Sequence, residues 1–188
     1  MERELFQRFF KNCYLILIKN KGGIKNIMGN HEINLRLEPL NQWICDECGE
    51  IIKSPEDGWL EWIAEEGTGL FCGHRIAHHA AASPYRKDNN KNCYRYSQNP
   101  RKADMHLGDF TGHEGIGKFF SVLNLKQFSA DIENWLEVFR RLHLKYYEEA
   151  RLYWEDAHQD GFFEDKKSGI YLPHTLLELI TQYGNLAS

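Results

Sequence analysis

Cysteine and histidine side chains gather in one stretch of this 188-residue chain. Four of the five cysteines and three of the nine histidines lie within it: Cys45, Cys48, Cys72, Cys93, His74, His78 and His79. Thiolate sulfur and imidazole nitrogen are the ligands that Zn²⁺ prefers in proteins. An odd number of cysteines in a chain without a signal-peptide cleavage pattern argues against a disulfide framework. The stretch therefore predicts a zinc site.

The pair Cys45-x-x-Cys48, followed by Gly49, has the form of a zinc knuckle. Two thiolates at this spacing can bind one tetrahedral ion, while glycine permits the backbone conformation that the turn requires. A thioredoxin-like redox motif has the same spacing, but it needs a βαβ context. The acidic residues Asp46 and Glu47 between the cysteines also disfavour a low thiolate pKa. Zinc binding is therefore the favoured interpretation.

The two remaining ligands must come from farther along the chain. Cysteine follows a polar loop at position 93, and a pair of histidines ends a predicted strand at positions 78 and 79. The expected ligands, in a zinc-ribbon-like or treble-clef-like arrangement, are Cys45, Cys48, His78 and Cys93. His79 takes the place of His78 if the register of the strand differs by one residue. In a competing set Cys72 and His74 complete the site, although both would then lie within a strand.

Four protein ligands would close the coordination sphere of the metal. A catalytic zinc keeps one position for water or substrate, whereas a closed site is structural. A small β-rich module has a thin core, and a bound metal can supply the missing folding free energy. We therefore expect a structural Zn²⁺ that holds such a module together.

Residues 34–100 carry the pattern of strands and turns. Apolar residues alternate with polar ones from 33 to 37, an aromatic-rich run spans 59–63, and a second alternating run spans 70–79. A short run at 93–96 predicts a further strand. If the segment 70–79 is extended, one face carries Leu70, Cys72, His74, Ile76 and His78.

Residues 105–184 change to helical spacing. Thr111 and Glu114 have the form of a capping box, so a helix is expected to begin there. Another helix is expected between Pro173 and Gly184. Between these two, apolar residues repeat in heptads and predict one long helix over about 130–159. The seam of that helix either packs inside the molecule or forms a homodimer or protein-partner interface.

These patterns together predict an α+β protein. A zinc-stapled β-rich module is expected at 29–104, and a three-helix part at 105–188. The apolar spacing within residues 1–28 predicts a helical N-terminal extension, and Gly22 and Gly23 would end its helix.

A basic stretch, residues 85–102, follows the strand that ends with His78 and His79. It contains one acid, Asp88, and three interleaved tyrosines. Its basic residues are Arg86, Lys87, Lys91, Arg95, Arg101 and Lys102. Such a patch can contact phosphates while tyrosines stack on bases, which is typical of nucleic-acid binding. In the alternative interpretation, the loop is solvated and its tyrosines pack on the zinc site.

The segment also resembles the zinc-bearing His-Asn-His nuclease finger over about 40 residues. The resemblance rests on the upstream Cys45-x-x-Cys48 pair, the histidines His78 and His79, and the asparagine-rich loop after them. It implies a metal-dependent endonuclease in which a histidine activates water. The second C-x-x-C pair of that family is missing, since only Cys93 is present.

The bulk properties set limits on function. The net charge is −4, which disfavours a nonspecific nucleic-acid binder, although local patches can still be basic. No apolar run reaches the roughly 18 residues of a membrane-spanning helix, and the pattern suits a cytoplasmic protein. The expected function is that of a non-enzymatic zinc-binding recognition or adaptor protein, which contacts a protein partner or nucleic acid; the endonuclease is the alternative.

Overall fold

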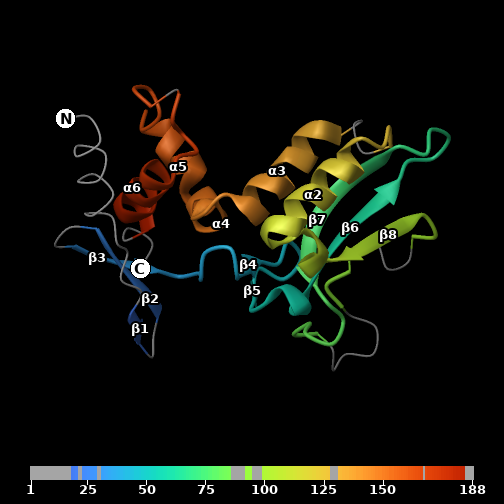
Figure 1. Ribbon diagram of the computed structural model, residues 1–188, viewed down its shortest axis with the longest axis horizontal. Helices are drawn as coiled ribbons and strands as arrows, with labels where there is room; N and C mark the ends of the chain where they lie inside the picture. The colour runs from blue at the N-terminus through green and yellow to red at the C-terminus, as the bar shows by residue number, and fades with distance from the viewer. Residues whose placement is uncertain are drawn as a thin grey trace, which may run out of the picture.

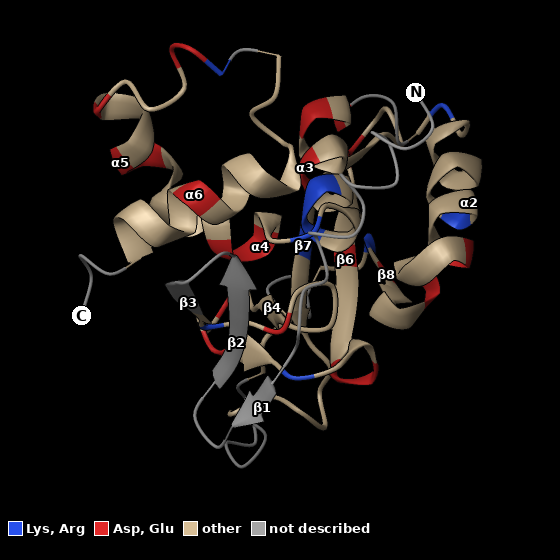
Figure 2. Ribbon diagram, turned by 60° about the vertical axis from the view of Figure 1, so that its left-hand side comes forward, with Lys and Arg blue, Asp and Glu red and all other residues tan. Residues whose placement is uncertain are grey.

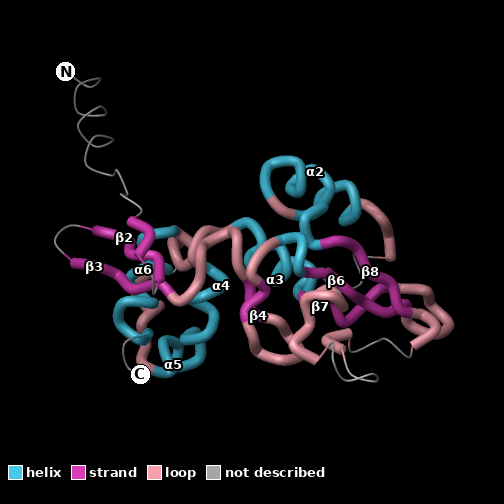
Figure 3. Tube along the Cα trace, turned by 90° about the horizontal axis from the view of Figure 1, so that it is seen from below, coloured by secondary structure: helices cyan, strands magenta, loops and turns pink. Residues whose placement is uncertain are grey.

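The structure is a computed structural model that describes residues 18–20, 23–28, 31–85, 92–94, 99–127, 131–166 and 168–184, with side chains from Asn34 onward. Within these ranges the chain forms two halves, which lie side by side in Figures 1 and 3. The first half has an apolar core drawn from residues 43–142. The core of the second half combines Leu35 with residues from 146 to 183.

A three-stranded antiparallel sheet is the centre of the first half. Its strands are β6 (Gly58–Ala64), β7 (Phe71–His78) and β8 (Lys102–His106), in the order β7-β6-β8. The β6 and β7 strands agree with the runs predicted at 59–63 and 70–79. Residues 92–94 are not in a strand, so the strand predicted from Cys93 is wrong over the described residues.

The pairing of β6 and β7 shifts register in the middle of the sheet. Glu61 is paired with Arg75, whereas Ile63 is paired with Cys72, so β7 contains one extra residue there. Gly73 has a positive φ of 66°, which glycine adopts at little steric cost. Because paired residues share a face, the bulge places Cys72 on the face of Arg75, opposite to His74. The prediction that one face carries both Cys72 and His74 is therefore wrong.

Two helices cover one face of this sheet: α2 (Gly112–Leu123) and α3 (Ile132–His143). Phe119 of α2 stacks on Trp135 of α3 at 4.6 Å between ring centroids, and both side chains are fully buried. The first core thus runs across the boundary expected at residue 104. The α2 helix begins after Thr111 as predicted, although the Thr111 side chain makes no capping hydrogen bond.

A small hairpin lies at the end of the sheet toward the second half. It consists of β4 (Trp43–Ile44) and β5 (Ile51–Ile52), and the 3₁₀ turn η1 (Pro55–Asp57) links it to β6. A second 3₁₀ turn, η2 (Leu107–Phe110), links β8 to α2. The fully buried Trp43 anchors the hairpin, because its indole nitrogen donates a hydrogen bond to the Arg141 carbonyl at 3.1 Å.

The second half contains short helices and an antiparallel sheet, and its elements are α4 (Tyr147–Ala150), η4 (Arg151–Tyr153), α5 (Trp154–Gln159), α6 (Pro173–Tyr183), β1 (Ile18–Asn20), β2 (Gly23–Met28) and β3 (His31–Leu35). The α6 helix agrees with the helix expected after Pro173. Residues 18–20 and 23–28 form strands, so the helical prediction for the N-terminal extension is wrong there. Residues 1–17 lie outside the described part of the chain.

The single helix expected over 130–159 is also wrong. The α3 helix ends at His143, and Tyr146 has a left-handed φ of 75° before α4 begins. Leu144, with an extended backbone, ends α3, and the left-handed Tyr146 turns the chain before α4. The heptad seam is therefore divided between the two halves of the molecule. Of its residues in α3, Phe139 packs against the first core, whereas Ile132 is 37% exposed. Its later residues Tyr146, Ala150 and Ala157 belong to the second core.

The predicted α+β class is confirmed by these sheets and helices, whereas the zinc-ribbon-like or treble-clef-like arrangement remains a prediction. Within the described residues, no helix combines the length and the apolar character needed to cross a bilayer.

Candidate metal centre

Four side chains from three separate segments meet beside the β4–β5 hairpin. Cys45 and Cys48 lie in the turn that follows β4, His78 ends β7, and Cys93 lies in the loop before β8. Each residue can offer one ligand atom to a metal ion, a cysteine sulfur or a histidine ring nitrogen. These four atoms all lie within 4.8 Å of one another. The structure thus brings together the ligand set that the sequence analysis favoured.

The turn from Cys45 to Gly49 presents the first two thiols. The Gly49 amide donates a hydrogen bond to the Cys45 carbonyl at 3.0 Å, and the Cys45 amide donates one to the Glu50 carbonyl at 2.9 Å. Gly49 has a φ of 73°, which a side chain would disfavour. This closed turn directs both sulfur atoms toward the same point.

Both ring nitrogens of His78 have defined roles. Its Nδ1 lies 3.4 Å from the Cys48 sulfur and 3.7 Å from the Cys93 sulfur. Its Nε2 lies 3.3 Å from the Ile51 carbonyl, an acceptor that holds the proton on Nε2 and leaves the Nδ1 lone pair directed at the thiols. A tetrahedral zinc site has sulfur-to-nitrogen separations of about 3.5 Å. The observed distances therefore have the size that such a site requires.

The thiol pKa values disfavour ionisation of all three groups together in the absence of a cation. Burial is the main reason that the pKa of Cys93 is raised to about 12, and neighbouring Cys45 and Cys48 raise it further. Burial also opposes ionisation of Cys45, but hydrogen bonds from the backbone and from the His78 ring, when that ring is protonated on both nitrogens, outweigh burial and lower the pKa to about 6. A bound dication would stabilise all three thiolates together.

A cradle of polar contacts positions the Cys45–Cys48 turn. The Asp46 amide donates to the Ile76 carbonyl at 2.9 Å, and the Ile76 amide donates to the Asp46 carboxylate at 2.8 Å. Asp46 therefore extends the free edge of β7 like a short extra strand. Arg141 donates to both carboxylate oxygens of Asp46, at 2.9 and 2.7 Å.

The Asp46–Arg141 contact was missed by the sequence analysis. The two residues are separated by 95 positions. Arg141 lies in the segment expected to form the long helix but outside its apolar seam, where an arginine suggests an exposed position, yet it is only 5% exposed. No local signal in the sequence predicts this ion pair between a buried arginine and a carboxylate of the turn.

The competing ligands lie elsewhere. Cys72 is partly buried, on the face of the sheet opposite to that of His78. The His74 ring packs between Trp62 and Trp135, whose ring centroids lie 5.9 and 4.9 Å away. His79 stacks on Trp59 at 5.5 Å, and its Nδ1 accepts a hydrogen bond from the Ala81 amide. The structure therefore does not bring these residues into the cluster.

The basic stretch is described only in part. Of the six residues predicted to bind nucleic acid, four lie outside the described residues: Arg86, Lys87, Lys91 and Arg95. Arg101 forms an exposed ion pair with Glu66 at 3.0 Å, and the Lys102 ammonium lies 5.5 Å from the centre of the Tyr94 ring. Tyr94 in turn contacts Trp59, so this tyrosine packs against the sheet.

The chemical capacity of the cluster is that of a metal ligand set. Three sulfur atoms and one imidazole nitrogen match the preferences of Zn²⁺ for both donor type and number. Four protein donors leave no position for a substrate on a tetrahedral ion. Comparisons with models of protein families, with curated proteins and with solved structures found no match to this chain.

Proposed function

We propose that this chain is a non-enzymatic recognition protein whose binding surface is held in shape by a structural Zn²⁺. One observation carries the proposal: four donors from three distant segments converge, and the Ile51 carbonyl orients the His78 ring toward the three thiols. Such second-layer contacts are typical of metal ligands. The metal would join the hairpin turn, the end of β7 and the loop around Cys93.

The same geometry disfavours the endonuclease. A general base needs a free nitrogen that faces substrate or water. The Nδ1 of His78 faces the thiols, and the Nδ1 of His79 accepts a backbone hydrogen bond. Because Nδ1 of His79 accepts a hydrogen bond, the proton of its neutral ring is on Nε2. Neither His78 nor His79 therefore offers a free ring nitrogen that could activate water.

The proposed binding surface lies in the segment 83–93, which ends at the proposed ligand Cys93. Ser83 lies 3.1 Å from the Cys93 sulfur, so both ends of the segment 83–93 meet beside the cluster. Tyr85 is 37% exposed at the start of this segment, and most of the basic stretch lies within or just beyond it. We propose a polyanionic partner, with nucleic acid as the candidate, because cations and tyrosines together suit phosphates and bases.

Metal content tests the first part of the proposal. We expect about one equivalent of zinc per chain in protein purified without added metal. Cys93→Ser is expected to lose most of this zinc, whereas Cys72→Ser, a matched change outside the cluster, retains it. Zinc-free wild-type protein, or equal zinc loss in both variants, would contradict the proposal.

Binding of oligonucleotides tests the second part. Zinc-loaded protein is expected to bind fluorescent single- or double-stranded oligonucleotides, with an affinity that falls as salt concentration rises. Removal of zinc, or the double change Arg86→Ala and Lys87→Ala, should weaken this binding. Undetectable binding at low salt would exclude nucleic acid and leave a protein partner as the candidate.

A further inference from the structure

A chain of charged side chains, in which Arg141 and Glu148 are buried, connects the cluster with the second half of the molecule. Arg141, at the end of α3, lies between Asp46 of the knuckle and Glu148 of α4. It donates to both Glu148 carboxylate oxygens, at 2.7 and 3.0 Å, in addition to its two bonds with Asp46. Figure 2 shows the basic end of α3 beside the acidic residues of α4.

Backbone groups of the hairpin strand join the same network. Arg141 donates to the Ile44 carbonyl at 2.9 Å, and the Ile44 amide donates to Glu148 at 2.8 Å. Ile44 directly precedes the ligand Cys45. Arg151 adds a second cation to Glu148, at 3.0 Å. The two halves thus meet through contacts to the residues on either side of Cys45.

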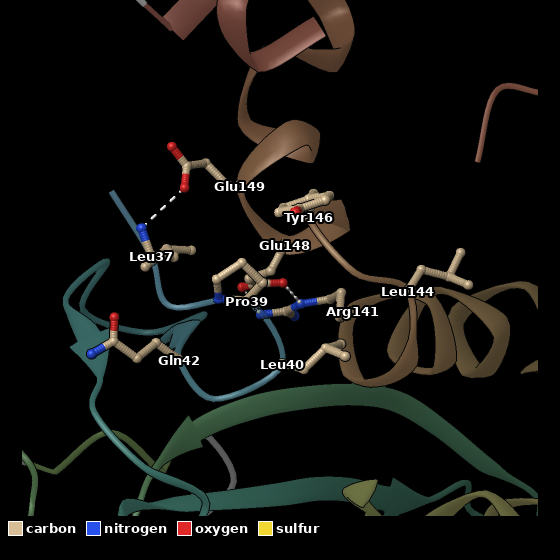
Figure 4. A pocket seen from close by; sticks show the side chains of 9 residues that line it. All are labelled: Leu37, Pro39, Leu40, Gln42, Arg141, Leu144, Tyr146, Glu148 and Glu149. Carbon is tan, nitrogen blue, oxygen red and sulfur yellow. Dashed lines mark hydrogen bonds and ion pairs between the residues drawn. The ribbon is translucent and has the colours of Figure 1, made fainter. Parts of the chain in front are cut away.

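The connections between the halves contain strained backbone at the same place. Leu40, in the segment between β3 and β4, has a φ of 63°, and Tyr146, between α3 and α4, has a φ of 75°. Both line one small cavity of about 10 Å³, together with Arg141 and Glu148 (Figure 4). Non-glycine residues keep such conformations only where their surroundings hold them, and they occur often in switch regions.

Asp46 is the residue through which metal binding would reach this junction. It lies between two proposed ligands in the chain, so its position depends on the shape of the knuckle. Arg141 is 5% exposed and depends on Asp46 and Glu148 for its charge partners. Movement of Asp46 would leave a buried cation partly unpaired, which is strongly unfavourable.

We propose that zinc binding is energetically coupled to the packing of α4–α6, through Asp46, Arg141 and Glu148. The inference rests on the proposed zinc site. It adds that binding of zinc by the Cys45–Cys48 turn stabilises the packing of the second half against the first. Thermodynamic coupling is reciprocal: the factor by which zinc favours the packed state is also the factor by which packing strengthens zinc binding. A change in α4 that loosens the packing should therefore weaken zinc binding.

Zinc affinity of an α4 variant tests the reciprocal effect. Glu148→Gln leaves all four ligands in place and keeps a similar shape. We expect it to weaken zinc binding about tenfold in competition with a chromogenic chelator, within the usual range of coupling. Glu66→Gln, which makes the same charge change in an exposed ion pair of the first half, should keep wild-type affinity.

Hydrogen exchange of a knuckle variant tests the forward effect. Zinc-loaded Asp46→Asn is expected to exchange the amides of α4 and α6 about tenfold faster than zinc-loaded wild type, while β6 keeps its protection.

The two experiments separate failure of the coupling from failure of the zinc site. Wild-type protein that binds one zinc, with unchanged affinity in Glu148→Gln and unchanged exchange in Asp46→Asn, overturns the coupling alone. Wild-type protein that binds no zinc overturns the proposed function.

Discussion

His78 shows how a single residue acquires its role from its neighbours. A histidine at the end of a strand can face solvent, an apolar core or a ligand. Here the Ile51 carbonyl and the sulfur atoms of Cys48 and Cys93 surround the ring and define the direction of each nitrogen. The next residue, His79, stacks on Trp59 instead. Trp59 pairs with Ala77, which lies on the face opposite to that of His78, and His79 continues this alternation just beyond the end of β7.

The cluster could be predicted from the sequence because zinc ligands follow simple spacing rules. A C-x-x-C pair before glycine predicts the knuckle. His78 at the end of a predicted strand and Cys93 after a polar loop then supply the two further ligands. The position of Cys72 could not be predicted, because the bulge at Gly73 reverses the face of the strand. Glycine occurs in many strands without a bulge, so the residue type alone does not show it.

His74 should make stability depend on pH. Burial is the main reason that its pKa is lowered from 6.5 to about 4, although Asp131 and Asn134 act in the opposite direction. The unfolded state therefore binds more protons between pH 6.5 and 4, and the folded state loses stability as pH falls through this window. The total loss is on the order of 3 kcal/mol.

A comparison of wild type with His74→Gln isolates this effect. The variant cannot titrate at this position, so the difference in unfolding free energy between the two proteins should change steadily from pH 6.5 to 4. Zinc release contributes to both proteins and cancels. A difference that stays constant across the window would show that His74 is not buried in its neutral form.

At the scale of elements, the break between α3 and α4 is the main departure from expectation. Apolar residues continue at heptad spacing through the break, because each short helix also needs an apolar face. The break is visible only in the backbone, where Leu144 is extended and Tyr146 is left-handed. Leucine favours helices and tyrosine rarely adopts the left-handed conformation, so neither residue type indicates a helix end.

The Cys45–Gly49 turn permits a test at this scale. Gly49 and Gly67 have φ values of 73° and 83°, and an added Cβ would meet no atom within 4 Å at either position. Alanine at either position should therefore destabilise the fold by about 1 kcal/mol through backbone strain alone. Only Gly49→Ala should also weaken zinc binding, because its turn orients two thiols.

Chemical denaturation and zinc competition measure these two effects separately. Equal zinc affinities of Gly49→Ala and Gly67→Ala would mean that the turn does not position the ligands. Stability that is unchanged in both variants would mean that these backbone conformations relax without strain.

At the scale of the whole molecule, two cores depend on one junction of charges. The first core combines the sheet with α2 and α3, and the second combines Leu35 with the C-terminal helices. Burial of Glu148 would raise its pKa, but Arg141 and Arg151 outweigh this effect and hold the pKa below its ordinary value. The α+β class could be predicted from the change of periodicity along the chain. The division into these halves could not, because long-range contacts such as Arg141–Asp46 decide it.

Removal of metal should destabilise the whole chain. At a free zinc concentration a thousandfold above Kd, a ligand contributes about 4 kcal/mol to stability, which corresponds to roughly 10 °C in Tm for a chain of this size. We expect a strong chelator to lower Tm by this amount and added Zn²⁺ to restore it. Mg²⁺ should not restore it, because thiolates bind Mg²⁺ weakly. A Tm that is insensitive to the chelator in zinc-loaded protein would contradict a structural role for the metal.

X-ray absorption at the zinc edge of the purified protein tests the central claim most directly. The account predicts a first shell of three sulfur atoms at about 2.3 Å and one nitrogen at about 2.0 Å. The zinc that Cys93→Ser still binds should show one sulfur fewer in this shell, and Cys72→Ser should leave the shell unchanged. A shell made only of oxygen and nitrogen atoms, or one that is identical in all three proteins, would contradict it.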